Sequence, residues 1–160
     1  MRILSIDPSL TCCGWAIFDR HHAKLLHVGR IIPGDSKKPL AKRLERIAEG
    51  LTDLPTDSFD RVVIEVPSGH VGRNRHGGGG AGLSLYGLAV GYVIGVTKSL
   101  GPPALVKEND WTNGVPKKTR TLVIQRTVPR YKSIPDPGGD IADAIGLGQW
   151  WLQKHRTQLG

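Results

Sequence analysis

Four acidic residues stand where their carboxylates could act together. Asp7 ends the apolar run "RILSID", and Glu65 ends the run "RVVIE". Asp140 and Asp143 follow two glycines in "GGDIADAIG", and a spacing of three residues puts both on one face of a helix. Open α/β sheets place functional residues at strand ends, so the sequence predicts that these four side chains meet.

A cluster of four carboxylates needs a counter-charge, because such groups cannot all stay ionised close together without one. Hard divalent cations with oxygen ligands meet that need. Two such ions about 3.5–4 Å apart would stabilise the attacking and leaving oxygens of a phosphodiester hydrolysis. We therefore predict two Mg²⁺ ions per active site, with Mn²⁺ as a possible substitute, bound by the catalytic residues Asp7, Glu65, Asp140 and Asp143.

Two of these acids have a simpler explanation when each is taken alone. Asp7 could be a turn residue in "DPS", and Asp140 could be an ordinary N-cap. Glu65 ends a buried run, and Asp143 stands between two alanines one turn into a helix, where capping does not explain an acid. The combination, rather than any single member, predicts the metal site.

Composition and charge narrow the class of protein. The 160 residues favour one domain spanning 1–160, and a formal net charge of +8 predicts binding to a polyanion, with nucleic acid first. Cys12 and Cys13 are adjacent, which suits a reducing compartment rather than a disulfide or a zinc site. We find no apolar run long enough to cross a membrane and no signal peptide, so we expect a cytoplasmic protein with no membrane partner.

Hydrophobic patterning predicts the elements that position the acids. Strand patterns cover 2–7, 15–19, 23–32, 61–67 and 103–106. Helical patterns cover 36–54, 83–100 and 140–155, and residues 109–128 read as a turn followed by a helix. This order predicts an α/β fold with a mixed five-stranded sheet flanked by helices on both faces. The small-residue helix 83–100 is a candidate dimer face, with ordinary core packing as the alternative.

Basic residues gather in two segments that suit phosphate contact. Residues 67–82 read as a mobile, basic, glycine-rich loop, for which a mere linker is the alternative. The second segment, 117–130, begins a helix. The predicted DNA-binding residues are His70, Arg73, Arg75, His76, Lys117, Lys118 and Arg120.

Together these motifs resemble the RuvC family of Holliday-junction resolvases, within the ribonuclease-H-like superfamily. "ILSIDPSLTCCGWAIFD" is similar to that family's opening strand, acid, turn and second strand, "VVIEVP" to its second acidic strand, and "DIADAIGLG" to its D-x-x-D-A helix. The resemblance implies a ribonuclease-H-like fold and a homodimeric, Mg²⁺-dependent endonuclease. Such an enzyme places paired symmetric nicks in a four-way DNA junction during recombination and repair.

The resemblance also implies a catalytic lysine near the start of the helix that precedes the last acids. Lys117 or Lys118 could fill that place, and we prefer Lys118. Ser9 stands where family members often carry glycine, although a "DPS" version is also familiar, and two further positions depart from the family pattern. Ser68 stands where some members carry an aromatic wedge, and Thr112 follows Trp111 where a basic residue is common. These departures bear on junction recognition more than on metal chemistry.

Other functions compete with junction resolution. A nuclease of the same fold could act on flaps, forks or RNA–DNA hybrids, because the metal acids would be shared. A junction-binding protein without catalysis would normally have lost an acid, and none is lost here. An actin-like ATPase or sugar kinase would need a second lobe, for which 160 residues leave no room.

Overall fold

The structure is a computed structural model that describes residues 1–56, 58–68 and 80–156. Its described residues form a five-stranded sheet of order β3-β2-β1-β4-β5. The pairs β1·β2 and β2·β3 are antiparallel, whereas β1·β4 and β4·β5 are parallel. The predicted mixed sheet is therefore confirmed. The strands are β1 (Arg2–Asp7), β2 (Cys13–Asp19), β3 (Lys24–Ile31), β4 (Arg61–Val66) and β5 (Pro103–Lys107).

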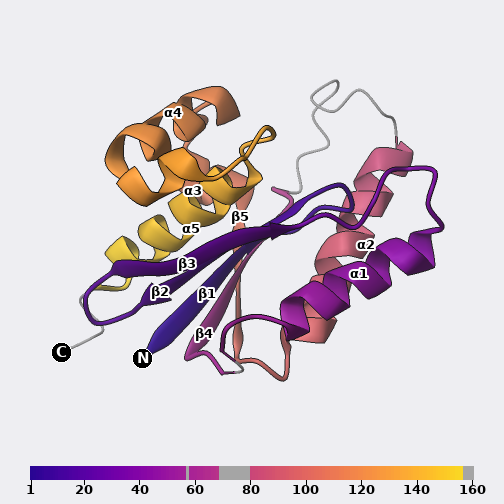
Figure 1. Cartoon of the computed structure of the whole chain (residues 1–160), viewed down its shortest axis with the longest axis horizontal. Coiled ribbons are helices and arrows are strands. Elements are labelled where there is room, and N and C mark those ends of the chain that lie inside the picture. Colours follow the sequence, from indigo (N-terminus) through magenta and orange to yellow (C-terminus); the bar gives the residue numbers. More distant parts are fainter. Residues whose placement is uncertain (57, 69–79, 157–160) are drawn as a thin grey trace.

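Helices cover both faces of this sheet, as the sequence predicts. On one face lie α1 (Leu40–Thr52) and α2 (Gly80–Thr97), and on the other lie α3 (Glu108–Thr112), α4 (Lys117–Thr127) and α5 (Asp140–Lys154) (Figure 1). A short 3-10 helix, η1 (Pro129–Ser133), links α4 to the segment before α5. The helix that carries Asp140 and Asp143 thus packs on the same face as the helix that carries the candidate lysines.

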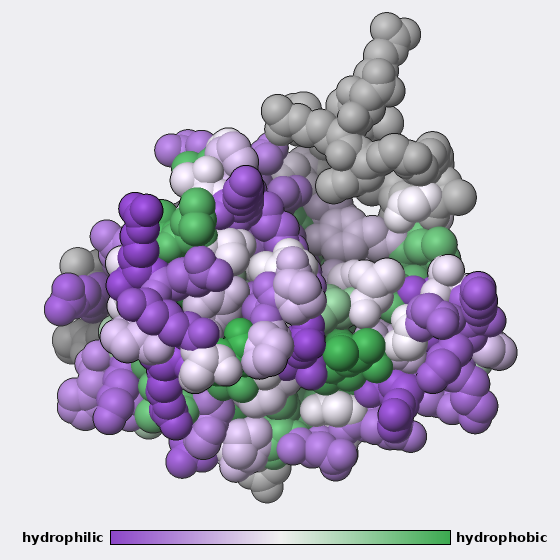
Figure 2. All heavy atoms as spheres, turned by 45° about the horizontal axis from the view of Figure 1, so that its top comes forward, coloured by the Kyte–Doolittle hydropathy of each residue, from purple (hydrophilic) through white to green (hydrophobic). Residues whose placement is uncertain are grey.

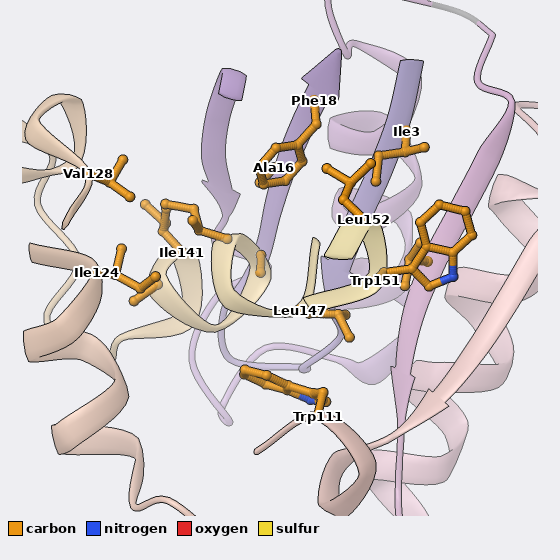
Figure 3. Close-up of a cluster of buried hydrophobic side chains, with 14 of the residues drawn as sticks. Ile3, Ala16, Phe18, Trp111, Ile124, Val128, Ile141, Leu147, Trp151 and Leu152 are labelled. Atoms are coloured by element: carbon orange, nitrogen blue, oxygen red, sulfur yellow. The ribbon is translucent and has the colours of Figure 1, made fainter. Parts of the chain in front are cut away.

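Alternation along β1 divides the core between the two faces. Ile3 faces α5, whereas Leu4 and Ile6 face α1 and α2, because successive side chains of a strand point to opposite sides. Figure 3 shows the hydrophobic cluster on the α5 face of the sheet. Helix α5 runs through this cluster, with Ile3, Ala16 and Phe18 on the sheet side. Helix α5 is therefore buried along most of its length, which gives its acids a rigid support.

A buried hydroxyl adds a polar anchor between this helix and the sheet. Ser5 Oγ, in the middle of β1, lies 2.7 Å from the carbonyl oxygen of Ala144 on α5 and 3.2 Å from that of Ala16 on β2. Ser5 is fully buried, so its hydroxyl needs such partners. The bond fixes α5 along the strand that ends in Asp7.

Helices α1 and α2 differ from the prediction at their ends, and α3 was not predicted. Helix α1 spans Leu40–Thr52, where the helical pattern covers 36–54. Helix α2 begins at Gly80, inside the predicted loop 67–82, and ends at Thr97. Residues 108–112 form the short helix α3 where the sequence suggested a turn. Glu108 and Asp110 in its first turn favour that helix through the helix dipole.

Within the described ranges, no helix is both long and apolar enough to span a bilayer. Figure 2 shows a face on which hydrophilic side chains predominate, with smaller hydrophobic areas between them.

Candidate active site

The first two acids lie side by side at one edge of the sheet. The parallel pairing of β1 with β4 runs through Ile6 and Ile64, and each acid is the next residue of its strand. Asp7 and Glu65 are only 8% and 7% exposed. Parallel strands deliver their carboxyl ends to the same edge, so the sheet register brings these two buried carboxylates together.

The start of α5 approaches this edge because Gly14 has no side chain. Gly14 pairs with Asp7 in the antiparallel register of β1 and β2. A Cβ atom on Gly14 would collide with the backbone carbonyl of Asp140, the first residue of α5. Asp143, one turn further along, is 3% exposed. The glycine thus lets both helical acids come next to the strand acids.

A fifth carboxylate, that of Asp136, caps the helix that carries two of the acids. Its Oδ1 accepts the backbone N–H of Asp140 and its Oδ2 that of Ala142, each over 3.0 Å. The hydroxyl of Tyr131 donates to the same Oδ2 over 2.7 Å. The N-cap position itself is Gly139, which has a left-handed backbone (φ 72°) and no side chain for this task. Asp136 therefore does the work of an N-cap side chain.

Lys117, rather than Lys118, reaches the acids. Its Nζ lies 2.7 Å from Asp140 Oδ1, 3.2 Å from Asp143 Oδ2 and 3.8 Å from Asp7 Oδ2. Lys118, the next residue along α4, is exposed. Consecutive helical residues point about 100° apart, so only one of the two lysines can face α5. This geometry favours Lys117 over Lys118, which we preferred from the sequence, for the role of the active-site lysine.

Burial and charge shift the pKa values in this cluster. Burial, with the nearby charge of Glu65, raises the pKa of Asp7 well above its usual value. Burial raises the pKa of Glu65 to about 7. Burial would lower the pKa of Lys117, but the surrounding carboxylates of Asp7, Asp143 and Asp140 outweigh it and raise the pKa overall. The cluster therefore holds its lysine charged, while crowded carboxyl groups resist ionisation.

Three further side chains donate hydrogen bonds to two of the acids: Arg120 to Asp143, and Trp111 and Tyr86 to Glu65. Arg120 donates from Nε and Nη2 to the two oxygens of Asp143, each over 2.9 Å. Trp111 Nε1–H donates to Glu65 Oε2 over 2.7 Å, and Tyr86 donates its hydroxyl hydrogen to Oε1 over 3.2 Å. Each carboxylate retains lone pairs beyond those that these donors use.

The donor set suits a hard cation, although the cation now at its centre is an ammonium. Among the described residues, no three acidic, histidine or cysteine side chains are drawn together as a metal-ligand group. Instead, Lys117 contacts three of the carboxylates. When all four carboxyl groups are ionised they outnumber the two cationic side chains that face them, and a bound cation favours that ionised state. All-oxygen donors with excess negative charge are what Mg²⁺ or Mn²⁺ requires.

The other predicted DNA-contact residues fall into three groups. His70, Arg73, Arg75 and His76 lie outside the described residues, as does most of the predicted loop 67–82. Lys118 is exposed on α4 and available to a phosphate. Arg120 is not: its side chain is 13% exposed and turned to Asp143.

The departures from the family pattern at Ser68 and Thr112 have internal roles in this structure. At the position of the aromatic wedge, the Ser68 hydroxyl accepts the backbone N–H of Asn109 in α3 over 2.9 Å. Thr112, after Trp111, is buried. Ser68 thus joins the end of β4 to the helix that carries Trp111.

Sequence reasoning missed the residues that orient the acids. Trp111 and Tyr86 donate to Glu65, Asp136 accepts from the start of α5, and Tyr131 donates to Asp136. A partial signal existed for Asp136, because an acid before "PGG" and a helix start suits capping. A buried tryptophan usually finds a partner for its N–H, but the sequence does not say which.

Comparisons with known proteins agree with this architecture. No protein-family model matches the chain. The crossover junction endodeoxyribonuclease RuvC of Cupriavidus necator is 30% identical over 158 residues, covering 92% of this chain and 81% of that protein. The RuvC of Renibacterium salmoninarum is 29% identical over 151 residues, covering 92% of this chain and 77% of that protein.

Solved structures show the same fold. The structure of Thermus thermophilus RuvC in complex with a Holliday junction substrate matches with a TM-score of 0.71 at 20% identity, over 100% of this chain and 98% of that chain. The fowlpox virus Holliday junction resolvase matches with a TM-score of 0.58 at 16% identity, over 99% and 100% of the two chains. With sequence relatives at this identity and coverage, the chain belongs to the RuvC family of crossover junction endodeoxyribonucleases.

Proposed function

We propose that this protein is a metal-dependent endonuclease that resolves four-way DNA junctions. One observation carries the proposal: carboxylates from β1 and α5 surround the ammonium of Lys117, and the pairing of β4 with β1 brings Glu65 next to Asp7. The relatives named as crossover junction endodeoxyribonucleases, and the T. thermophilus RuvC bound to a Holliday junction, support the choice of substrate.

Asp7, Glu65, Asp140 and Asp143 would hold two Mg²⁺ ions. Three of the four are buried and come from different elements, which restricts their movement. When bound, the ions supply Lewis-acid stabilisation of the phosphate and a more acidic water. Mn²⁺ takes the same oxygen donors and would substitute for Mg²⁺.

Lys117 supplies a positive charge on the protein side of the site. Its side chain is 41% exposed, so it faces both the acids and the solvent from which DNA would approach. We propose that its ammonium contacts the scissile phosphate and balances the charge that develops there. In the reaction a water oxygen bonds to phosphorus while the bond from phosphorus to the 3′ oxygen breaks. The products carry a 5′-phosphate and a 3′-hydroxyl.

Basic side chains outside the acid cluster would hold the junction arms. We propose that Lys118 contacts a phosphate, together with His70, Arg73, Arg75 and His76 of the 67–82 segment. The net charge of +8 supports binding that weakens steeply with salt.

We propose a homodimer that pairs through α2, which would give two active sites for a substrate with approximate two-fold symmetry. One face of α2 is in the core, where Ala89 and Val93 are fully buried. The other face is open: Leu85 and Leu88 are 43% and 42% exposed. A Cβ atom added at Gly87, Gly91 or Gly95 would meet nothing within 4 Å. Glycines four residues apart let two helices approach closely.

Sedimentation velocity tests the dimer. The wild-type chain should sediment as a dimer, and Gly91→Arg, which places a large charged side chain in the open face, should sediment as a monomer with unchanged circular dichroism. A wild-type monomer at all concentrations would contradict the dimer, as would a Gly91→Arg dimer.

Substrate choice tests the main proposal. The protein is incubated with a labelled four-way junction, a flap, a linear duplex and an RNA–DNA hybrid, with Mg²⁺ and with a chelator. We expect paired nicks in the junction only, and only with Mg²⁺. Equal cutting of the linear duplex would overturn the proposal, and selective cutting of flaps or hybrids would point to the alternative nuclease.

A conservative variant tests the metal acids. Asp143→Asn keeps the size of the side chain and removes its charge, so it should bind the junction normally and lose cleavage by on the order of 1,000-fold. Cleavage at the wild-type rate would contradict the assignment of Asp143.

A further inference from the structure

Each of the three nitrogens of the Arg120 guanidinium has a hydrogen-bond acceptor within the protein. Nε and Nη2 each lie 2.9 Å from an oxygen of Asp143, and Nη1 donates to the carbonyl oxygen of Val115 over 2.6 Å. The side chain is 13% exposed. A two-pronged bond of this kind fixes the plane of the carboxylate, which a lysine at the same place could not do.

The ring of Trp111 packs against this guanidinium, and its N–H group binds a second acid, Glu65. The Arg120 guanidinium carbon lies 4.9 Å from the centroid of the Trp111 ring, which is a cation–π contact. The Trp111 Nε1–H donates to Glu65 Oε2 over 2.7 Å. Its ring also packs against α5, where a Cβ added at Gly146 would lie 2.9 Å from the ring. Figure 3 shows the Trp111 ring beside Leu147 of α5.

These contacts form a continuous path between two acids that lie on different elements. Asp143 on α5 is bonded to Arg120 on α4, Arg120 stacks on Trp111 of α3, and Trp111 is bonded to Glu65 on β4. Asp143 Oδ2, which accepts from Arg120, also lies 3.2 Å from Lys117 Nζ. Asp143 is thus held by both Arg120 and Lys117, whereas Glu65 is held by Trp111 and Tyr86.

We infer that Arg120 and Trp111 are positioning residues that brace Asp143 and Glu65 for metal binding, and that Arg120 is not a phosphate contact. This inference rests on the proposed function, since it assigns roles around the same acids. It replaces our sequence-based expectation that Arg120 binds DNA.

Four variants separate a brace from a DNA contact. Arg120→Gln removes the charge and the two-pronged bond. Arg120→Lys keeps the charge and removes only the geometry. Trp111→Phe keeps an aromatic ring and removes the N–H donor. Arg126→Gln is the matched control, because it removes a positive charge from the exposed last turn of the same helix. Circular dichroism and urea unfolding establish that each variant is folded.

Three quantities are measured for each variant: junction affinity without divalent metal as a function of salt, the single-turnover cleavage rate at saturating junction, and Mn²⁺ affinity by isothermal titration without DNA. Arg120→Gln should keep the junction affinity and its salt slope, and should lose on the order of 10- to 100-fold in cleavage rate and in Mn²⁺ affinity. Arg120→Lys should not rescue either loss. Trp111→Phe should also lower the cleavage rate and the Mn²⁺ affinity. The double variant Arg120→Gln/Trp111→Phe should lose less than the product of the two single effects. Arg126→Gln should keep the cleavage rate and the Mn²⁺ affinity.

Opposite results would overturn the inference. If Arg120→Gln lowers the salt slope of junction binding by about one and keeps the cleavage rate at saturation, Arg120 is a phosphate contact. If Arg120→Lys behaves like the wild type, charge rather than geometry matters. If Mn²⁺ binds as tightly as in the wild type, or more tightly, Arg120 does not brace the acids. If the wild-type protein cuts no junction, the proposed function is wrong. The Mn²⁺ affinity of the Arg120 variants would still show whether Arg120 positions the acids.

Discussion

The Nζ atom of Lys117 lies 2.7 Å from Oδ1 of Asp140, so the first residue of α4 is tied to the first residue of α5. Both residues lie in the first turn of a helix, at the positive end of its dipole. Carboxylates are stabilised in such a place and an ammonium is not, so Lys117 depends on its acidic neighbours. The positive charge of Lys117 is therefore stabilised by the carboxylates of Asp7, Asp140 and Asp143.

Replacing Lys117 by alanine should slow cleavage without releasing the junction. The variant loses the positive charge that faces both Asp140 and the solvent, and removing one such charge from the reacting centre costs on the order of 100- to 1,000-fold in rate. Single-turnover cleavage at saturating junction and Mg²⁺ measures this loss.

Lys118→Ala is the matched control, since it removes the same charge one residue further along α4, on the exposed side. It should weaken junction binding modestly and keep the cleavage rate of bound junction. The roles that we assign to the two lysines are wrong if Lys118→Ala loses cleavage and Lys117→Ala does not.

Gly14→Ala should displace the start of α5. The added methyl group would strike the backbone carbonyl of Asp140 and approach the nitrogen of Ile141 to 3.0 Å, and neither backbone atom can rotate away. Such overpacking costs about 1–3 kcal/mol of unfolding free energy. Cleavage should fall further than this stability loss explains, because Asp140 moves away from Asp7. Urea unfolding and single-turnover cleavage measure the two effects.

Gly82→Ala is the control for that substitution, because a Cβ there would meet nothing within 4 Å. It lies in the first turn of α2 and should change the unfolding free energy by less than about 1 kcal/mol. Normal cleavage by Gly14→Ala would show that the close approach of α5 is not needed.

Much of the fold and the four acids could be predicted because their signals are local. Each of Asp7 and Glu65 ends an apolar run, and a buried strand that ends in an acid is visible in a few residues. The i, i+3 spacing of Asp140 and Asp143 is equally local. Parallel pairing then brings the ends together, and the structure confirms the sheet that does so.

The choice between lysines and the orienting residues could not be predicted, because they depend on how helices are rotated and packed. Lys117 and Lys118 are equivalent in sequence, and only the rotation of α4 over α5 turns one inward. Arg120 looks like a phosphate contact until Asp143 is found beside it. Trp111 and Glu65 are bonded across 46 positions of the chain, a separation that no spacing rule covers.

Mg²⁺ should stabilise the folded protein against heat. Binding to the folded state at 100 times Kd adds about 2.7 kcal/mol, which corresponds to a rise of roughly 5–10 °C in Tm for a chain of this size. A chelator should reverse the rise, and Asp143→Asn should show a smaller one because it lacks one charged ligand. Differential scanning calorimetry measures the shift. A Tm that does not respond to Mg²⁺ in the wild type would contradict the metal site.

Asp136→Ala should loosen the helix that carries two of the acids. The variant leaves the backbone N–H groups of Asp140 and Ala142 without their acceptor, and loss of an N-cap costs about 0.5–2 kcal/mol. Tyr131→Phe, which removes only the hydroxyl that holds the Asp136 carboxylate, should cost less. Both should raise the Mg²⁺ concentration needed for half-maximal cleavage, and Asp53→Ala, which removes an exposed acid at the end of α1, should not. Urea unfolding together with Mg²⁺ titration of the cleavage rate tests this, and an unchanged Mg²⁺ requirement in Asp136→Ala would show that the cap serves stability alone.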